Sequence, residues 1–493
     1  MSVAAVLAHV PIGLYSLPVP LGTILLAAVV VVGASFGLIY LRPPRVNEET
    51  ADQAAEVPPP VVWLLRAALV AYFAFVIYVG WFGRQQLAAL NAASLLFWVY
   101  TIPFLPIAHI FVGGMYEVGN PFAALARVLS GGRTLPNADA ILRRLGYWPA
   151  VAMLFLLVFA ESITEIVQRP AILGIGLLVY ATAQVIMGVL LGDGWYDGGD
   201  VFQAMTALAS TIALCALKRD ASGRVHLIVG FNPARFLPAA TGREALITLW
   251  LAGVLADGVR ATPIWRVLIL PRVAPSFESM GVVAGINSGP AAEITLEIVF
   301  TWIAFGLFFW VFVALATQLA RYAAEKRGSP VSLSSRQVAA IVSPSLIPIA
   351  LAYLFAHNLT QILVVGPLII SARNAPAAAL GPLTFQEISH ISPGLVWWTQ
   401  VSAIVVGHVL AVVMAHARLN QALPSAQAEP ATAAATRRGR QPRYASVGAL
   451  AARPTRRLHD SAFLADLGWL SAMVIYTATS LWILAQPITA SGR

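Results

Sequence analysis

Hydrophobic runs long enough to cross a lipid bilayer recur along the whole chain. A bilayer core is about 30 Å thick and a helix rises about 1.5 Å per residue, so roughly 20 apolar residues span it. The run from 20 to 41 does so without one charged residue. Hydrophobic residues make up 59% of the chain and charged residues 11%. We therefore predict an all-α polytopic protein, a transmembrane bundle of about ten helices with a range of 9–12.

The distribution of basic residues predicts the orientation of this bundle. Lys and Arg concentrate in cytoplasmic loops, and here they concentrate in alternate loops, including Arg127, Arg133, Arg143 and Arg144 after the third span. Both termini are then expected outside the cytoplasm. The predicted spans are 20–41, 61–83, 93–113, 148–167, 171–192, 244–258, 292–320, 337–357, 395–418 and 463–486.

Three regions follow from these spans. Residues 1–419 form the bundle, 420–460 a flexible basic cytoplasmic linker, and 461–493 the last transmembrane helix. Residues 201–217 are expected to form a helix that lies in or dips into the membrane, with an extra span as the alternative. Residues 359–371 are expected to belong to an outside loop and to re-enter the bundle or, alternatively, to span.

Whole-chain charge and cysteine content exclude some classes of partner. The net charge is +9, but the basic residues lie in loops between spans, so membrane topology accounts for them and no nucleic-acid partner is predicted. The expected partner is the lipid bilayer. Cys215 is the single cysteine, which excludes an internal disulfide framework and a multi-thiolate metal site.

Ionisable residues inside spans are costly, so they usually face the protein interior and often have a function. In the predicted topology several such residues fall at one depth, near the outer leaflet. They come from spans four, six, seven and eight, and His9 in the N-terminal segment is able to join them. The set is Glu161, Glu165, Asp257, Glu293, Glu297, Tyr353 and His357, and the uncharged polar residue Asn358 lies next to it in span eight.

A divalent metal is one interpretation of this set. Carboxylates mixed with imidazole suit Zn²⁺ or a similar ion, and the candidate ligands are Glu161, Glu165, Asp257, Glu293, Glu297 and His357. A proton site is a second interpretation. Solvation of helix ends by headgroups and water is a third, and ion pairs with Arg169 or Arg260 are a fourth.

Span nine carries three further polar residues. Gln400, His408 and His416 recur every eight residues, which is a little over two helical turns, so they are expected roughly on one face. A hydrogen bond to another helix is the favoured role for His408. A haem held by His109 together with His408 or His416 is disfavoured, because it needs matched depths that the topology supplies only loosely.

The segment GDGWYDGGD at 192–200 clusters Asp193, Asp197 and Asp200. It lacks the ligand spacing and the closing Glu of a calcium loop. An acidic turn at a helix end is therefore the predicted role of these residues.

Several segments together resemble one family of large multi-pass bacterial membrane proteins, common in actinobacteria and often labelled fenitrothion hydrolase. They are LPVP, NPFAAL, RLGYWPAV, DGVRATPIW, IPIALAYLFAHNL, the WWTQ…GHVLAVVMAH span and YTATSLWILAQP, which together cover nearly the whole chain. The resemblance implies a protein of the bacterial cytoplasmic membrane. It also implies a subunit of a metal-dependent phosphotriester hydrolase, with other membrane or periplasmic subunits as partners.

Three functions remain open from the sequence. A hydrolase would use a metal-activated water and a carboxylate as general base. A transporter of metal, protons or a small solute would use the same polar groups as a pathway, for example from His357 through His408 to His416. A structural or assembly subunit of a larger membrane complex is the third.

Overall fold

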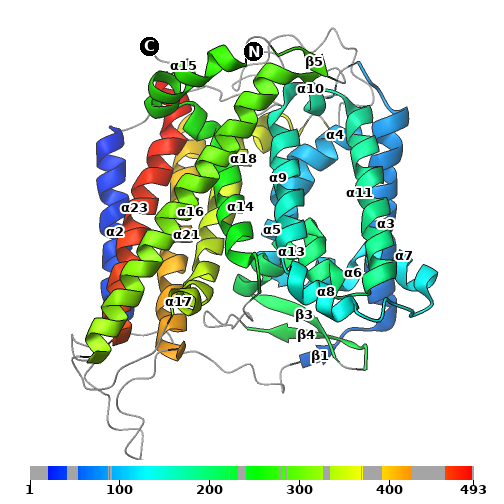
Figure 1. The fold of residues 1–493 in the computed structure, drawn as a ribbon, viewed down its shortest axis with the longest axis horizontal. Coiled ribbons are helices and arrows are strands. Elements are labelled where there is room, and N and C mark those ends of the chain that lie inside the picture. Colours follow the sequence, from blue (N-terminus) through cyan, green and yellow to red (C-terminus); the bar gives the residue numbers. More distant parts are fainter. Residues whose placement is uncertain are drawn as a thin grey trace, which may run out of the picture.

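The structure is a computed structural model, a helical bundle whose long helices run roughly parallel (Figure 1). It describes residues 20–41, 54–86, 88, 91–220, 222–230, 240–277, 280–283, 286–325, 334–367, 369, 391–422 and 461–490. Within these ranges, side chains are not described at 40–41, 164–165, 323–324, 364, 393, 420–422, 461–465 and 487–490. His9 and the 423–460 part of the expected linker therefore lie outside the described residues.

Eight helical segments in the described part are long and apolar enough to cross a membrane, and ten do so if each of two bent helix pairs counts as one span. The predicted all-α polytopic fold is confirmed, and each predicted span contains a helix of ten residues or more. These helices are α2 (Leu21–Leu41), α3 (Pro59–Phe82), α5 (Ile102–Phe111), α9 (Trp148–Ser162), α11 (Pro170–Leu191), α14 (Arg243–Arg260), α16 (Ser288–Glu325), α18 (Ile347–Val364), α21 (Pro393–Ala422) and α23 (Ser461–Ala490).

Shorter helices extend or connect these spans. Some lie in line with a long helix: α4 (Ala92–Ser94) and the π-helical η3 (Leu95–Thr101) lead into α5, and α17 (Ser335–Val342) and η7 (Ser343–Leu346) lead into α18. The others are α6 (Met115–Gly119), α7 (Pro121–Ser130), α8 (Ala138–Leu145), α10 (Thr164–Val167), α12 (Trp195–Gly199), α13 (Val201–Ala209), η4 (Ser210–Ile212), η5 (Ile264–Ile269), α15 (Leu270–Val273) and η6 (Ala274–Ser276).

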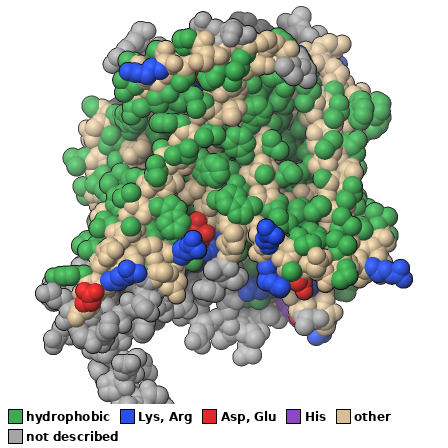
Figure 2. All heavy atoms as spheres, in the orientation of Figure 1, with side chains coloured by type: hydrophobic (Ala, Val, Ile, Leu, Met, Phe, Trp, Pro, Cys, Tyr) green, Lys and Arg blue, Asp and Glu red, His purple; other side chains and the backbone are tan. Residues whose placement is uncertain are grey.

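The chain alternates between two ends of the bundle. We call the end where α9, α14 and α18 finish the upper end, and the end where they begin the lower end, as they are drawn in Figure 1. Proline near the first helical position starts α3, α9 and α11, where its missing N–H leaves no hydrogen bond unmade. Figure 2 shows a broad hydrophobic face with most of its charged side chains along the lower edge, as a membrane-spanning surface requires.

Helix α18 is longer than the sequence predicted. It was expected to end at 357, but it continues to Val364 and closes with a turn in which the Val365 N–H donates to the Gln361 carbonyl. The start of the expected re-entrant segment 359–371 is thus the end of this helix, because its apolar residues extend the same hydrophobic run. Residue 368 and residues 370–390 lie outside the described part.

A small β-sheet lies at the lower end and was missed from the sequence. Its strand order is β1-β4-β3-β2, with β1 (Ala54–Glu56), β2 (Val112–Gly113), β3 (Cys215–Arg219) and β4 (Val225–Val229). β3 and β4 form an antiparallel hairpin, and β2 pairs with β3 in parallel. A second hairpin, β5 (Val282–Val283) with β6 (Ile286–Asn287), lies at the upper end.

Helix α13 enters the bundle from the lower end and does not cross it. It spans nine residues, nearly all of them buried, and packs against α5, α6 and α9. After η4 the chain is extended and enters β3 at Cys215. Residues 201–217 therefore dip into protein, and the alternative of an extra span is wrong because the apolar run divides between a short helix and a strand.

Candidate functional site

Charged side chains from three helices meet near the upper end of the bundle. Asp257 and Arg260 lie in the last turn of α14, Glu297 in α16 and His357 in α18. These four residues are the charged cluster. Asp257, Glu297 and His357 come from the predicted spans six, seven and eight, and Arg260 follows span six by two residues. The structure thus brings these three predicted groups together near one end of the bundle.

Arg260 is the cation at the centre of the charged cluster. Its Nε donates to Glu297 Oε2 at 2.6 Å, and its Nη2 lies 3.6 Å from Asp257 Oδ1. Glu297 is fully buried. A carboxylate taken out of water needs a paired charge, and the guanidinium supplies it. The ion-pair interpretation is therefore correct for Asp257 and Glu297.

His357 forms the other side of the charged cluster. Its Nε2 lies 3.7 Å from Asp257 Oδ2. Tyr353, one turn earlier on α18 and buried, places its ring nearly parallel to the imidazole with the centroids 6.3 Å apart. Glu293 is half-buried one turn before Glu297 and contributes to the electrostatic field at Arg260. Asp257 thus contacts both a guanidinium and an imidazole.

A cavity of about 40 Å³ lies beside Asp257 and His357. It is lined by α5, α9, α13, α14 and α18, and Glu161 and Ser162 of α9 face it. This volume has room for a few water molecules, since each needs about 10–15 Å³. Sequence reasoning placed Glu161 here correctly.

Two further lining residues hold buried polar atoms with no hydrogen-bond partner among the described residues. They are Asn358 Oδ1 and Trp250 Nε1. Asn358 is 1% exposed, and its Nδ2 donates to the Leu354 carbonyl of its own helix. Buried polar groups are normally satisfied, so such atoms indicate a site for water or another polar molecule.

The predicted divalent metal stays a prediction. In the described part of the chain, no three His, Cys, Asp or Glu side chains are arranged to hold one metal ion. The side chain of Glu165 lies outside the described residues, as His9 does. The position between Asp257 and Glu297 is taken by the Arg260 guanidinium.

His109 is a structural residue of the lower end. Its Nδ1 is 2.7 Å from the Leu105 carbonyl, and its Nε2 accepts the Tyr116 N–H at 3.0 Å. Nδ1 is therefore the protonated nitrogen. Both ring nitrogens have partners, and the imidazole joins the end of α5 to the start of α6.

The polar residues of span nine do not share one face, contrary to prediction. Eight residues turn a helix by about 800°, which leaves an offset of about 80° at each step. Gln400 Nε2 accordingly donates to the Ala356 carbonyl of α18, whereas His416 Nδ1 lies 2.7 Å from Asp466 Oδ2 of α23. His408 and His416, two steps of the predicted pathway that begins at His357, therefore lie on different faces of α21.

His408 is fully buried, as expected, but the predicted bond to another helix is wrong. Its Nδ1 pairs with the Ile404 carbonyl of its own helix at 2.8 Å. Its Nε2 has no hydrogen-bond partner among the described residues. Nδ1 of His408 is thus satisfied within α21, by the carbonyl one turn earlier.

A second polar cluster, at the lower end, is built around Asp200. This residue caps α13, accepting the N–H groups of Phe202 and Gln203. It also accepts hydrogen bonds from Tyr180 Oη at 2.6 Å, Asn120 Nδ2 at 2.9 Å and Tyr116 Oη at 3.3 Å. Burial raises the pKa of Asp200, and these hydrogen bonds oppose that effect.

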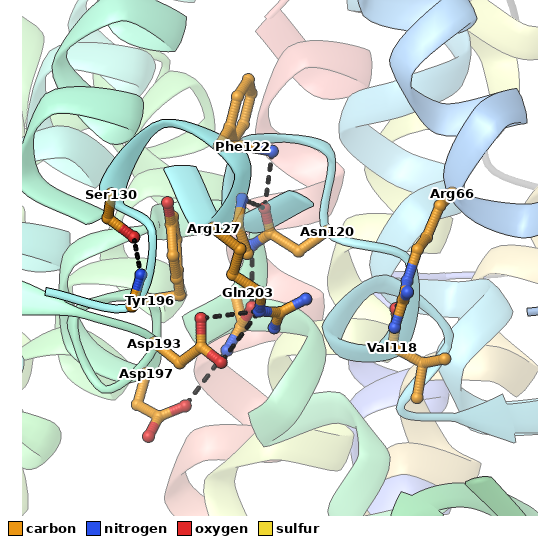
Figure 3. Close-up of polar contacts among 12 residues, drawn as sticks. Arg66, Val118, Asn120, Phe122, Arg127, Ser130, Asp193, Tyr196, Asp197 and Gln203 are labelled. Carbon is orange, nitrogen blue, oxygen red and sulfur yellow. Dashed lines mark hydrogen bonds and ion pairs between the residues drawn. The ribbon is translucent and has the colours of Figure 1, made fainter. Parts of the chain in front are cut away.

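The predicted acidic turn at 192–200 is present, but its three carboxylates have different roles. Asp200 is buried, Asp193 pairs with Arg127 at 2.9 Å, and Asp197 accepts a hydrogen bond from Gln203 (Figure 3). Asn120, which starts the NPFAAL segment, donates to both Asp200 and Gln203. The sequence signal for these contacts is weak. Asn120 directly precedes Pro121 and Asp200 directly follows Gly199, which indicates only that a helix begins at each position.

The chain matches no protein-family profile, no curated protein and no solved structure. The resemblance to the family often labelled fenitrothion hydrolase accordingly stays a prediction. What is established is an integral membrane protein with multiple apolar spans and a partly buried charged cluster.

Proposed function

We propose that this membrane protein translocates protons and that Asp257 and His357 form its proton-binding site. The observation that carries the proposal is their position, 3.7 Å apart beside a cavity of water-molecule size. Ionisable residues within transmembrane helices commonly mark proton relays or substrate pathways.

The charge of the cluster supports a bound proton. Asp257 and Glu297 together carry two negative charges when ionised, and Arg260 carries one positive charge. With His357 neutral, the cluster has a net charge of −1, which is costly at membrane depth. One added proton makes the cluster neutral, and the imidazole–carboxylate pair offers a place to hold it.

Two cavities along α9 support a route to this site. The upper cavity reaches Glu161, and a second cavity of about 290 Å³ at the lower end reaches Tyr147. Leu154 lines the upper cavity and lies seven residues from Tyr147, a rise of about 10 Å. Ala150 and Val151, which lie between these two positions on α9, are buried, so a route along this helix needs a conformational change or entry of water.

The hydrolase implied by the family resemblance has less support from this site. An upper cavity of about 40 Å³ holds water but not a molecule of phosphotriester size. The His357–Asp257 pair has the composition of a general base and its orienting carboxylate, so hydrolase activity is a second candidate only if the cavity widens.

The test is proton flux in liposomes that contain the purified protein, driven by an imposed potassium diffusion potential. We expect flux above that of empty liposomes, and a reduction of at least about tenfold in Asp257→Asn, which removes the titrating carboxylate but keeps its shape. Asp139→Asn, an exposed residue of α8, is the matched control and should retain wild-type flux. Absence of wild-type flux, or full flux in Asp257→Asn, would contradict the proposal.

A further inference from the structure

The lower cavity has the size and lining of a small-molecule site. It measures about 290 Å³, close to the lower limit of about 300 Å³ for ligand pockets. Leu142, Leu145, Tyr147 and Trp195 supply apolar and aromatic surface. Asp197 supplies the carboxylate, and no Lys or Arg is among the described residues that line the cavity.

The Asp197 carboxylate is held by a hydrogen bond to one of its two oxygens, and the other oxygen is available to a ligand. Gln203 Nε2 donates to Asp197 Oδ1 at 3.1 Å, and Gln203 is itself fixed by Asn120 Nδ2 at 2.8 Å. Figure 3 shows the second carboxylate oxygen of Asp197 directed away from Gln203. That oxygen has no hydrogen bond within the described part, and the side chain is exposed.

The charges around the cavity favour a cation. Surrounding protein raises the pKa of Asp197, and the neighbouring carboxylate of Asp193 acts in the same direction. Both effects are relieved when a positive charge binds beside Asp197. Aromatic rings next to a carboxylate are the usual surroundings of a bound ammonium group, because the faces of the rings attract cations.

We propose that the lower cavity binds a small organic ammonium ion, with Asp197 as its counter-charge and Trp195 and Tyr147 as its aromatic walls. The binding site itself does not depend on proton translocation. Its further role, as the site of a solute moved in exchange for protons, rests on the proposed function.

The test uses tetramethylammonium as the probe and measures its binding to the full-length protein in lipid nanodiscs by equilibrium titration. Wild-type protein should bind tetramethylammonium and not neutral tert-butanol, which is similar in size. Asp197→Asn should weaken binding at least about tenfold, since it removes the counter-charge of the ammonium group. Asp193→Asn is the comparison variant: its carboxylate acts on Asp197 but does not line the cavity, so its loss should weaken binding clearly less than Asp197→Asn does.

A second variant separates loss of the site from loss of folding. Ala207→Trp fills the cavity and leaves Asp197 intact, so it should also abolish binding while the thermal unfolding temperature stays near that of wild type. The proposal is overturned if wild type does not bind the probe, if Asp193→Asn weakens binding as much as Asp197→Asn, or if Ala207→Trp binds normally. Asp257→Asn should keep probe binding, so failure of this site and failure of the proton site are distinguishable.

Discussion

Asp200 organises the lower end through five hydrogen bonds. Its Oδ1 accepts from Tyr180 of α11 and from the first turn of α13, and its Oδ2 accepts from Tyr116 of α6. Asn120, which caps α7, also donates to Oδ2. Because the carboxylate is fully buried, it depends on these protein donors in place of water. The residue therefore fixes both the depth at which α13 enters the bundle and, through Asn120 and Gln203, the position of Asp197.

We expect Asp200→Asn to destabilise the protein. The amide keeps one acceptor oxygen, but its NH₂ group faces donors, so buried hydroxyl or amide groups lose their partner at about 1–3 kcal/mol each. The unfolding temperature in detergent, followed by intrinsic fluorescence, should fall by several degrees. Asp193→Asn, which breaks an exposed ion pair with Arg127, should change stability by no more than about 0.5–1 kcal/mol. Equal stability of the two variants would contradict this role for Asp200.

Sequence reasoning identified those members of the charged cluster whose exposure to lipid would be costly in free energy. Asp257, Glu297 and His357 are expensive in lipid, so their position near helix ends was enough to bring them together. The sequence also offered Arg260 as an ion-pair partner, but only as one of several interpretations, because nothing local shows that one guanidinium serves two carboxylates on different helices. At Asp200 the sequence showed only an acidic turn, since its donors Tyr116, Asn120 and Tyr180 are brought to it by tertiary packing alone.

Close helix contacts in this bundle depend on glycine. In α21, a Cβ atom at Gly407 would lie 2.5 Å from the Cβ of Ala352 and 2.8 Å from the Pro348 carbonyl of α18. Small residues allow such backbone approach in membrane helices. The contact holds α21 against the helix that carries His357.

We expect Gly407→Ala to lower the unfolding temperature, because the added methyl group overpacks this contact at a cost of about 1–3 kcal/mol. Gly306→Ala in α16 is the matched control, since nothing lies within 4 Å of its Cβ position. There the exchange should be neutral or stabilising by up to about 1 kcal/mol, from helix propensity alone. A Gly407→Ala protein as stable as Gly306→Ala would show that α18 and α21 separate easily.

Whole elements divide into those that hydropathy predicts and those that it does not. The long helices follow from runs of apolar residues, because in lipid a backbone must satisfy its own hydrogen bonds. The β-sheet at the lower end cannot be predicted from apolar runs. β3 begins at the end of an apolar run that was assigned to one helix, and β1 reaches β4 from more than 150 positions away. Strand pairing over such a distance leaves no local pattern.

The whole molecule has two chemically different ends, and the sequence predicts which end faces the cytoplasm. Arg143 and Arg144 lie in α8 at the lower end. We therefore expect Asp139→Cys, also in α8, to react with a membrane-impermeant thiol reagent only after cell lysis. Ser276→Cys in η6, at the upper end, should react in intact cells. Cys215 is first replaced by Ser in both proteins, and the reverse labelling pattern would invert the orientation.

The four charged residues of α14 have a consequence for how the protein is made. Arg243, Glu244, Asp257 and Arg260 leave this helix too polar to count as a span without the bent segment that follows it. If α14 entered the bilayer alone during synthesis, Arg260 would be exposed to lipid before its partner Glu297 had been synthesised. α14 is thus expected to wait at the insertion machinery until α16 emerges, so that the two helices leave for the bilayer as a neutralised pair.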